Sequence, residues 1–516
     1  MSVSSPRRYL SVWLRRLATD RILRGRGVAR AEDAPLAIVG EVKNAHRLTA
    51  LNDAAAALGL KAGTSLADAR VMYPMLAVEA ADPAADRLML AAVADWCDRY
   101  TPLVGLDPPD GIILDVTGCA HLFGGETDLC RDLIRRLAAQ GFQSRVAVAD
   151  TVGCAWAVTR YGTPAAVPPG GMREVLLPLP LAALHIASDI VALLAETGLR
   201  KIADVIGLPR APLAARFGEE FVRRLDQVLG REDEPITPRL SVPAYMAERR
   251  FADPIALEAD VLGTIEHLGD QLGHLLEARG EGARRLQAAL FRADGKVHRI
   301  EVGTGEPVRN AARVRRLFAE RLAAIGDACD PGFGFDVVRL SALVTERLDP
   351  VQTGLARDND QAELSHLVDR LSARFGERRV LRFVAQNTHI PELAVAAVPA
   401  QAKGTRLESY AVEQDSLGPV RPIRLFERPE AIMAVAEVPD GPPVRFRWRR
   451  VLHEVAAAEG PERIAMEWWR DDKGNALTRD YFRVESKEGV RVWLYREGLY
   501  GREVTQPRWF LHGLFA

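Results

Sequence analysis

The sequence lacks three features that would place it in a specialised class. Its five cysteines are scattered through 516 residues without a CxxC pair, which argues against a disulfide framework or a zinc site. No apolar run reaches about 18 residues and no apolar segment follows the N-terminal arginines, so neither a membrane span nor secretion is predicted. Lys and Arg number 68 against 69 Asp and Glu, so the whole chain is not a polycation. We therefore expect a cytoplasmic protein without a cofactor, whose nucleic-acid surfaces would need local segregation of charge.

The chain is long enough for several hydrophobic cores. At 48% hydrophobic residues, and about 100 to 200 residues per domain, three to five domains are expected. Strands alternate with helices at first, and a nearly all-helical segment, 177–229, ends in the charged, proline-rich stretch 231–238. Beyond it the predicted order is strand, helix, two strands, helix, strand over 244–343, a self-contained βαββαβ unit. The predicted fold class is α+β and multidomain.

One stretch, 104–126, organises the first part of the chain. A buried strand, 112–116, is entered through a Pro-Pro-Asp-Gly turn and carries Asp107, Asp110 and Asp115 on it or beside it. Carboxylates at the edge of a central strand can hold metal ions, so these three form a candidate metal cluster. A first strand is predicted at 8–14 and another at 35–40, with a small helical subdomain, 45–73, inserted into the same sheet.

The stretch from Asp110 to Gly118, DGIILDVTG, is similar to the sequence SIDEAYLDVTG of the Y-family translesion DNA polymerases. Supporting matches, in the family's order, are Gly59-Leu60-Lys61-Ala62-Gly63, Tyr100-Thr101-Pro102 and Ala147-Val148-Ala149. The resemblance covers about residues 5–350 and implies a palm with inserted fingers, a helical thumb and a βαββαβ little finger. The implied domains are a palm (1–30 and 80–165), fingers (31–79), a thumb (166–238), a little finger (239–345), a linker and helix (346–380) and a C-terminal partner-binding region (381–516).

The residues that carry polymerase chemistry are mostly missing from the matching positions. Nucleotidyl transfer uses two metal ions on closely placed carboxylates. The family takes these from DxD on the first strand and from the DE of SIDE, whereas this chain has Trp13 and Gly111 at such positions and keeps Asp110. Asp115 matches a position outside the catalytic set, so Asp107 and Asp115 are more simply read as turn caps or structural groups.

The implied nucleotide-binding residues have also changed. The YEAR motif is replaced by Asp53-Ala54-Ala55-Ala56, so Asp53 and Ala56 stand where a Tyr and an Arg hold the triphosphate. Replacing a cation by a methyl group and adding an acid disfavours a polyanion. Trp156 lies in the segment that replaces the lysine pattern NKxLAK, and Ile186-Ala187-Ser188 replaces the thumb's Gly-Val-Gly hairpin. The resemblance thus implies a polymerase scaffold without catalytic, nucleotide-binding or metal-binding residues.

Basic residues gather in the predicted βαββαβ unit. A basic sheet and helix can hold a phosphate backbone, although such a cluster can also be an ordinary solvated face. The candidate DNA-binding residues are Arg284, Arg285, Arg292, Lys296, Arg299, Arg309, Arg313 and Arg316.

The C-terminal region has a different composition, because ten of the chain's 33 aromatic residues follow Ile464. Aromatics interleaved with arginine can stack on bases, anchor a protein or simply fill a small β-domain core. Glu467-Trp468-Trp469 and the segments 478–484 and 507–515 resemble the end of the ImuB family, the inactive Y-family homologues of bacterial mutagenesis cassettes.

That resemblance implies a scaffold that binds a sliding clamp, a RecA-like ImuA partner and an error-prone C-family DNA polymerase, and that joins the nucleoid on DNA damage. The candidate clamp-binding residues are Gln352 and Leu355, in a segment that lacks the aromatic anchor of the family's QxxLF motif. Two rivals remain at this point. One is an active translesion polymerase that uses Asp107, Asp110, Asp115 or Asp150 in an altered metal site, and the other is a protein hub that never touches DNA.

Overall fold

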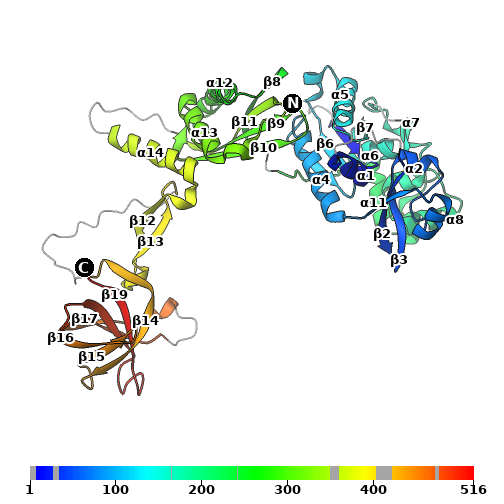
Figure 1. Cartoon of the computed structure of the whole chain (residues 1–516). Helices are drawn as coiled ribbons and strands as arrows, with labels where there is room; N and C mark the ends of the chain where they lie inside the picture. The colour runs from blue at the N-terminus through cyan, green and yellow to red at the C-terminus, as the bar shows by residue number, and fades with distance from the viewer. Residues whose placement is uncertain are drawn as a thin grey trace. The chain divides into compact units, whose positions relative to one another are not determined.

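The computed structural model describes residues 7–26, 34–163, 166–240, 242–348, 359–402, 421–470 and 476–516. The chain divides into two compact units, Met1–Gln361 and Ala362–Ala516 (Figure 1). No helix in these described ranges combines the length and the apolar character needed to cross a bilayer.

The first unit is built on a four-stranded antiparallel sheet in the order β5-β6-β1-β7. Its strands are β1 (Tyr9–Trp13), β5 (Val104–Asp107), β6 (Gly111–Asp115) and β7 (Arg145–Ala149). Central β1 alternates strictly, since Leu10 and Val12 face the core under α4 (Pro83–Cys97) and α5 (Glu126–Ala139), whereas Tyr9 faces α6 (Val152–Tyr161). Helices on both faces therefore bury β1, and this fixes the positions of its ends.

The strand predicted at 35–40 is confirmed, but the helical subdomain predicted at 45–73 is only partly helical and is not inserted in that sheet, so this part of the prediction is wrong. Residues 36–80 lie outside the four-stranded sheet. They form a separate three-stranded sheet, β3-β2-β4, with two short helices. The elements are β2 (Leu36–Val42), β3 (Ala45–Leu51), α2 (Asp53–Ala57), α3 (Leu66–Met72) and β4 (Ala77–Ala80), preceded by α1 (Leu17–Gly25). Lys43 and Asn44 make a two-residue turn with positive φ angles of 51° and 61°, which joins β2 to β3 as a hairpin. β3 buries only Leu48, so its sequence lacks a clear apolar alternation.

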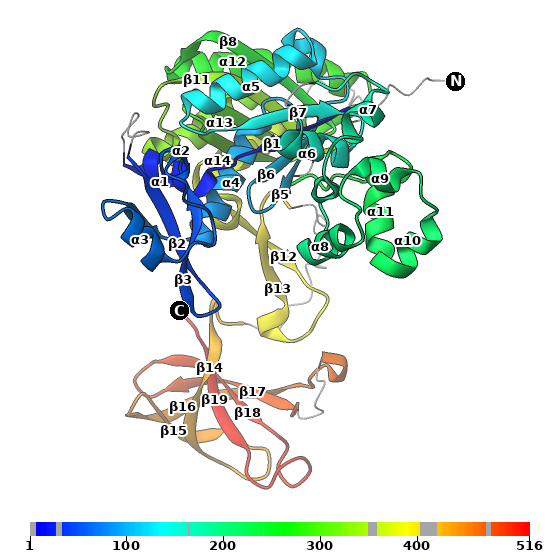
Figure 2. The ribbon, with the colours of Figure 1, turned by 90° about the vertical axis from the view of Figure 1, so that its right-hand side faces the viewer.

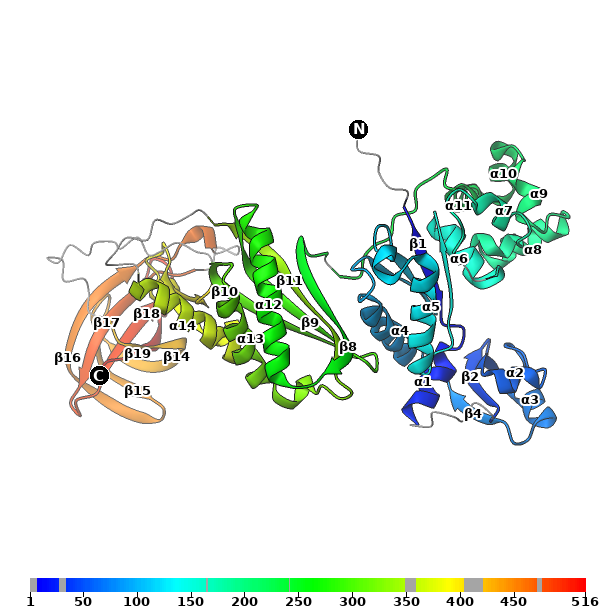
Figure 3. The ribbon, with the colours of Figure 1, turned by 90° about the horizontal axis from the view of Figure 1, so that it is seen from above.

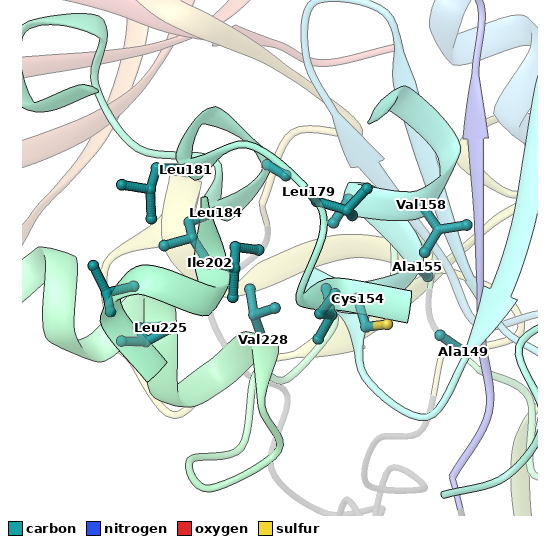
Figure 4. Packing of buried hydrophobic residues seen from close by; sticks show 14 of the residues in the cluster. Ala149, Cys154, Ala155, Val158, Leu179, Leu181, Leu184, Ile202, Leu225 and Val228 are labelled. Carbon is teal, nitrogen blue, oxygen red and sulfur yellow. The ribbon is translucent and has the colours of Figure 1, made fainter. Parts of the chain in front are cut away.

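Helix α6 joins the four-stranded sheet to the helical segment that follows. Ala155 and Val158 of α6 share one core with Ala149 of the sheet and with Leu184 and Val228 of that segment (Figure 4). The segment consists of α7 (Met172–Leu176), α8 (Ser188–Glu196), α9 (Ile202–Ile206), α10 (Arg210–Phe217) and α11 (Glu219–Val228), seen together in Figure 2. Helix α6 packs against the sheet on one side and against the helical segment on the other. Its remaining face is therefore held in a fixed position at the end of the sheet.

The βαββαβ order of the next segment is confirmed. Strands β8 (Tyr245–Ile255), β9 (Glu281–Arg292), β10 (Val297–Val308) and β11 (Phe335–Arg347) form a sheet in the order β10-β9-β11-β8. Helices α12 (Glu258–Glu277) and α13 (Ala311–Ile325) pack against each other and cover one of its faces (Figure 3).

The second unit ends in a closed six-stranded barrel. Before it come α14 (Asn359–Phe375), which crosses the boundary between the units, and the hairpin of β12 (Leu381–Ala385) and β13 (Val395–Pro399). The barrel strands are β14 (Arg424–Ala436), β15 (Pro443–Trp448), β16 (Val451–Ile464), β17 (Arg479–Ser486), β18 (Arg491–Glu497) and β19 (Arg508–Leu514). Aromatic residues such as Phe446, Phe482 and Trp509 lie in the enclosed core, whereas Tyr481, Trp493 and Tyr495 form a second cluster on the other face of the strands. The predicted fold class, α+β with a β-rich C-terminal region, is confirmed, while the domain boundaries stay predictions.

Candidate functional site

The candidate site lies beside α6, where β1 and β5 end and β6 begins. The register of the sheet places Trp13 opposite Gly111, so the two positions lie side by side. Helix α6 starts at Val152 and is capped by Thr151, whose hydroxyl oxygen accepts a hydrogen bond from the Cys154 backbone N–H. Trp156 and Arg160 are four residues apart on this helix and so share one face.

Arg160 lies between the two carboxylates of the β5–β6 turn. Its Nη2 is 3.1 Å from Asp107 Oδ2 and 3.2 Å from Asp110 Oδ1. The side chain of Arg160 is only 10% exposed, and those of Asp107 and Asp110 are 16% and 29% exposed. One guanidinium thus pairs with both acids in a mostly desolvated position, where such pairing is strong.

Two tryptophans complete the surroundings of this cation. The guanidinium carbon of Arg160 is 4.3 Å from the ring centre of Trp156 and 5.5 Å from that of Trp13. Trp13 Nε1 donates to Asp110 Oδ2 and Trp156 Nε1 donates to Asp107 Oδ2, each at 2.8 Å. We call Trp13, Asp107, Asp110, Trp156 and Arg160 the arginine cage. Its members contact one another by ion pairs, indole hydrogen bonds and cation–π contacts, although Arg160 Nη1 is buried without a hydrogen-bond partner among the described residues.

The arginine cage puts a protein cation where a metal ion would need the same carboxylates. A divalent ion of the Mg²⁺ type takes oxygen ligands, and here the oxygens of Asp107 and Asp110 already accept from Arg160 and from an indole. Among the residues that the structure describes, no group of three His, Cys, Asp or Glu side chains is arranged to hold a metal ion. The predicted three-carboxylate cluster is not assembled.

The other acids considered for metal binding have separate partners. Asp115 Oδ1 accepts from the Thr117 backbone N–H at 2.9 Å, which caps the turn after β6. Asp150 forms an ion pair with Arg8 and accepts from the Gly170 backbone N–H.

Gly111 lies against the cage, and a side chain there would crowd it. A Cβ atom at this position would come within 2.4 Å of Asp107 Oδ2 and 2.9 Å of Arg160 Nη2. Because real Cβ atoms do not approach so closely, any larger residue at 111 requires Asp107 and Arg160 to move.

An internal ion pair also occupies the region where the resemblance places the triphosphate. Asp53, the first residue of α2, forms ion pairs with Arg16 and with Arg15, the latter at 2.6 Å from Arg15 Nη2 to Asp53 Oδ1. Ala56, three residues later, is exposed and offers no charge. The arginines beside the first strand therefore have a carboxylate partner from the chain itself.

A hollow of about 280 Å³ opens beside the cage, between α6 and the helical segment. Asp107, Glu220 and Glu234 line it, against the single cation Arg224, which is paired with Glu234 at 2.5 Å. Trp156 stacks on His185 here with ring centres 4.1 Å apart. Burial lowers the pKa of His185, and Arg224 and Arg160 act in the same direction, against the effect of Asp107. The hollow is acidic, which disfavours a triphosphate.

The candidate DNA-binding residues fall into two groups. Five have partners within the chain. Arg284 pairs with Glu346, Arg292 pairs with Asp294 and Asp330, and Arg299 pairs with Asp95 and Asp98. Arg309 donates to the carbonyls of Glu281 and Leu348, and Arg313 also has a contact. Arg285, Lys296 and Arg316 are exposed, and within the described residues they form no ion pair. Only these last three are free to meet a phosphate.

Arg299 belongs to a network that joins the βαββαβ sheet to α4 and the residues just after it. Arg299 Nη2 is 2.6 Å from Asp98 Oδ2, and Arg339 donates to the Asp98 carbonyl. Arg99 pairs with Asp336 at 2.6 Å, with side-chain exposures of 2% and 8%. Burial raises the pKa of Asp98, against the effect of Arg299. Sequence reasoning missed this network, because the partners are up to 241 residues apart.

Three further sequence predictions can be placed. Gln352 and Leu355 lie outside the described residues. At the thumb position, Ala187 precedes α8 without a side-chain cap. Arg160 was missed by sequence reasoning, although its spacing of four from Trp156 on a predicted helix was a usable signal.

Comparisons with known proteins were made for the whole chain. The impB/mucB/samB family model matches residues 28–160. Protein ImuB of Caulobacter vibrioides is 42% identical over 469 residues, which cover 89% of this chain and 100% of the relative. DNA polymerase IV 2 of Mesorhizobium japonicum is 24% identical over 266 residues, covering 50% of this chain and 63% of that protein. Among solved structures, DinB from Sulfolobus solfataricus matches with a TM-score of 0.39 at 14% identity, covering 66% of this chain and 100% of that one.

Proposed function

The chain belongs to the ImuB family, and from this premise we propose that it is a non-catalytic, Y-family polymerase-like adaptor in DNA-damage-induced mutagenesis and translesion synthesis. The observation that carries the proposal is the arginine cage. A polymerase of this kind needs two metal ions on free carboxylates, and here Asp107 and Asp110 are already paired with Arg160. The adaptor binds DNA, while a partner polymerase performs the synthesis.

The nucleotide side of the site supports the same proposal. Asp53 supplies the negative charge that a triphosphate would otherwise bring to Arg15 and Arg16. An incoming nucleotide would have to displace this carboxylate and also enter beside an acidic hollow. Loss of metal binding and loss of nucleotide binding thus have independent structural causes.

Primer extension tests the absence of catalysis. The purified full chain, incubated with a primed template, all four deoxynucleotides and Mg²⁺ or Mn²⁺, should add no nucleotide. Incorporation that disappears in Asp110→Ala and persists in Asp115→Ala would establish the alternative, an active translesion polymerase with an altered metal site. Asp115 is a matched control because its carboxylate caps a turn away from Arg160.

DNA binding is assigned to the exposed cations of the βαββαβ segment. Substituting Arg285, Lys296 and Arg316 together by Glu should weaken binding to primer-template DNA by at least about tenfold and flatten its salt dependence, because each phosphate contact adds about 0.9 to the slope for duplex DNA. Arg131→Glu is the control, since Arg131 is 72% exposed on α5 and pairs with Asp128. Equal affinity of the triple variant and the wild type would support the protein hub that never touches DNA. Arg292 and Arg299 are unsuitable for this test, because they hold ion pairs within the fold.

The partners proposed are a sliding clamp, a RecA-like ImuA protein and an error-prone C-family DNA polymerase. The second compact unit, Ala362–Ala516, is assigned to the binding of ImuA and of the polymerase. Pull-down of these partners with the full chain and with a chain ending at Gln361 tests the assignment. Retention of both partners by the shortened chain would contradict it.

A further inference from the structure

The hairpin of β15 and β16 carries a row of arginines on the outside of the C-terminal barrel. Side chains alternate along β15, so Phe446 points into the core and is 1% exposed, whereas Arg445 and Arg447 lie outside and are exposed. Residues two apart on a strand are about 7 Å apart, so these two guanidiniums form a short ladder along the strand. Arg449 and Arg450 follow at the hairpin tip and extend the same positive charge.

The two ladder arginines have no internal counter-ion. Among the residues that the structure describes, the side chains of Arg445 and Arg447 form no hydrogen bond or ion pair, whereas Arg449 pairs with Glu430 at 2.6 Å. Glu454, opposite Arg445 in the register, is bound by Lys487 at 2.7 Å. The charge of the ladder is therefore available to an external anion.

The hairpin tip is held in a costly backbone conformation. Trp448 pairs with Val451, so Arg449 and Arg450 form a two-residue turn, with positive φ angles of 46° and 73°. Asn and Gly are typical of such turns, because residues with larger side chains rarely adopt positive φ. Strain of this kind concentrates at functional sites, so two arginines at the tip are an independent sign of binding.

Apolar side chains flank the ladder on the same outer face. Met433 and Val435 of β14, opposite Arg447 and Arg445, are 66% and 52% exposed, and Leu452 of β16 is 49% exposed. A surface that alternates guanidinium groups with apolar side chains can hold phosphates and cover the faces of unpaired bases together.

The closed barrel favours a nucleic-acid strand over an extended acidic peptide. A peptide normally adds to a sheet through backbone hydrogen bonds at a free strand edge. This sheet is closed, so it offers no such edge. A phosphodiester strand needs no backbone pairing, because side chains alone bind its phosphates.

We propose that the outer face of β14, β15 and β16 binds single-stranded DNA, with Arg445 and Arg447 on successive phosphates and the bases against Met433 and Val435. This goes beyond the function proposed above, because it puts a second DNA contact in the C-terminal unit. The contact would hold unpaired template independently of Arg285, Lys296 and Arg316.

The test measures binding of the full chain to a fluorescein-labelled oligo(dT) by anisotropy over a range of salt concentrations. Arg445→Glu/Arg447→Glu should lose at least about tenfold in affinity and lower the slope of log K against log salt by about 1.4, since each phosphate contact on a single strand adds about 0.7. The control Arg491→Glu/Arg508→Glu has the same charge change on the same barrel, at arginines already paired with Glu485 and Glu497, and should keep most of the affinity and the slope.

Three outcomes would overturn the proposal. The first is an unchanged affinity and salt slope in Arg445→Glu/Arg447→Glu. The second is an equal loss of affinity in the control pair. The third is unchanged DNA binding together with loss of binding to an acidic protein partner. If the Glu pair does not fold, judged by its thermal unfolding midpoint, Arg445→Gln/Arg447→Gln should show a similar change in slope with a smaller loss of affinity. Repeating the measurement on the Arg285, Lys296 and Arg316 triple variant separates the two contacts, because the barrel-dependent change should persist there.

Discussion

In the first unit Arg160 lies inside the protein between two carboxylates, whereas on the C-terminal barrel Arg445 and Arg447 lie outside with no partner among the described residues. The charge of Arg160 is paired within the fold, whereas the charges of Arg445 and Arg447 are available to a ligand. The residue type is the same, so the difference lies in the available acids. Exposed charges that have no internal partner are therefore a better guide to the binding surfaces of this chain than the sites at which its relatives bind.

The largest expected effect comes from removing the cation of the arginine cage. Arg160→Met should lower the free energy of unfolding of the first unit by about 2–4 kcal/mol, because Asp107 and Asp110 would be left close together without a counter-ion. Urea denaturation followed by hydrogen exchange of peptides from β5, β6 and α6 measures this. Titration calorimetry with Mn²⁺ should in addition detect a weak site that the wild type lacks.

The matched control is Arg131→Met, which removes an ion pair between side chains that are 72% and 48% exposed. Such surface pairs contribute at most about 1 kcal/mol, so this variant should be nearly as stable as the wild type. Equal stability of Arg160→Met and Arg131→Met would contradict the role given to the arginine cage.

The second aromatic cluster of the barrel, on the outer face of β17, β18 and β19, contains a buried polar group that is kept uncharged. His512 is fully buried, and its Nδ1 lies 2.9 Å from the Tyr481 hydroxyl. Burial lowers the pKa of His512 to about 4, against the effect of Glu392 and with that of Arg479. The unfolded chain has a histidine pKa of about 6.5, so it takes up a proton first as the pH falls.

The barrel should therefore lose stability between pH 7 and pH 4, and by about 2 kcal/mol at pH 5, because the unfolded state binds the proton while the folded state does not. Above pH 7 this contribution is constant. Hydrogen exchange of peptides from β17 and β19 at several pH values gives the local free energy. His512→Gln cannot titrate, so the wild type and this variant should differ in their pH dependence over that window, and parallel curves would refute the assignment.

The smallest expected effect is a gain. Arg450→Gly should stabilise the barrel by about 1 kcal/mol, because glycine adopts the φ of 73° without steric cost. The same change should slightly weaken binding to oligo(dT). Arg428→Gly on β14 is the control, since Arg428 is exposed and has no positive φ, and there the change should be neutral or destabilising. A loss of stability in Arg450→Gly would mean that the tip is not strained.

Much of the fold followed from sequence pattern, since long periodic segments such as α12 and the strands β9 and β11 were found within a few residues. The fingers-like sheet was missed because β3 buries few large residues. At the site, the sequence allowed Trp13 and Gly111 to be compared with the Y-family pattern. The pairing of Arg160 with Asp107 could not be predicted, because the two side chains meet only through the packing of α6 against the sheet.

Arginine pairing across the βαββαβ segment was equally hidden. Arg292 and Arg299 look like phosphate ligands in a basic run, yet their carboxylates come from Asp294 and Asp330 in loops and from Asp98 some 201 residues away. Composition counts cations, but it does not reveal which of them are already bound.

Crowding around Gly111 restricts which substitutions the arginine cage can accept. An acid restored at 111 would collide with Asp107 and Arg160, and an acid restored at 13 would remove the indole that binds Asp110. Each single reversion therefore costs stability before any metal ion can bind, and Arg160 must be replaced as well. A single substitution at 13 or 111 therefore leaves Asp107 and Asp110 paired with Arg160, so it cannot by itself turn the cage into a metal site.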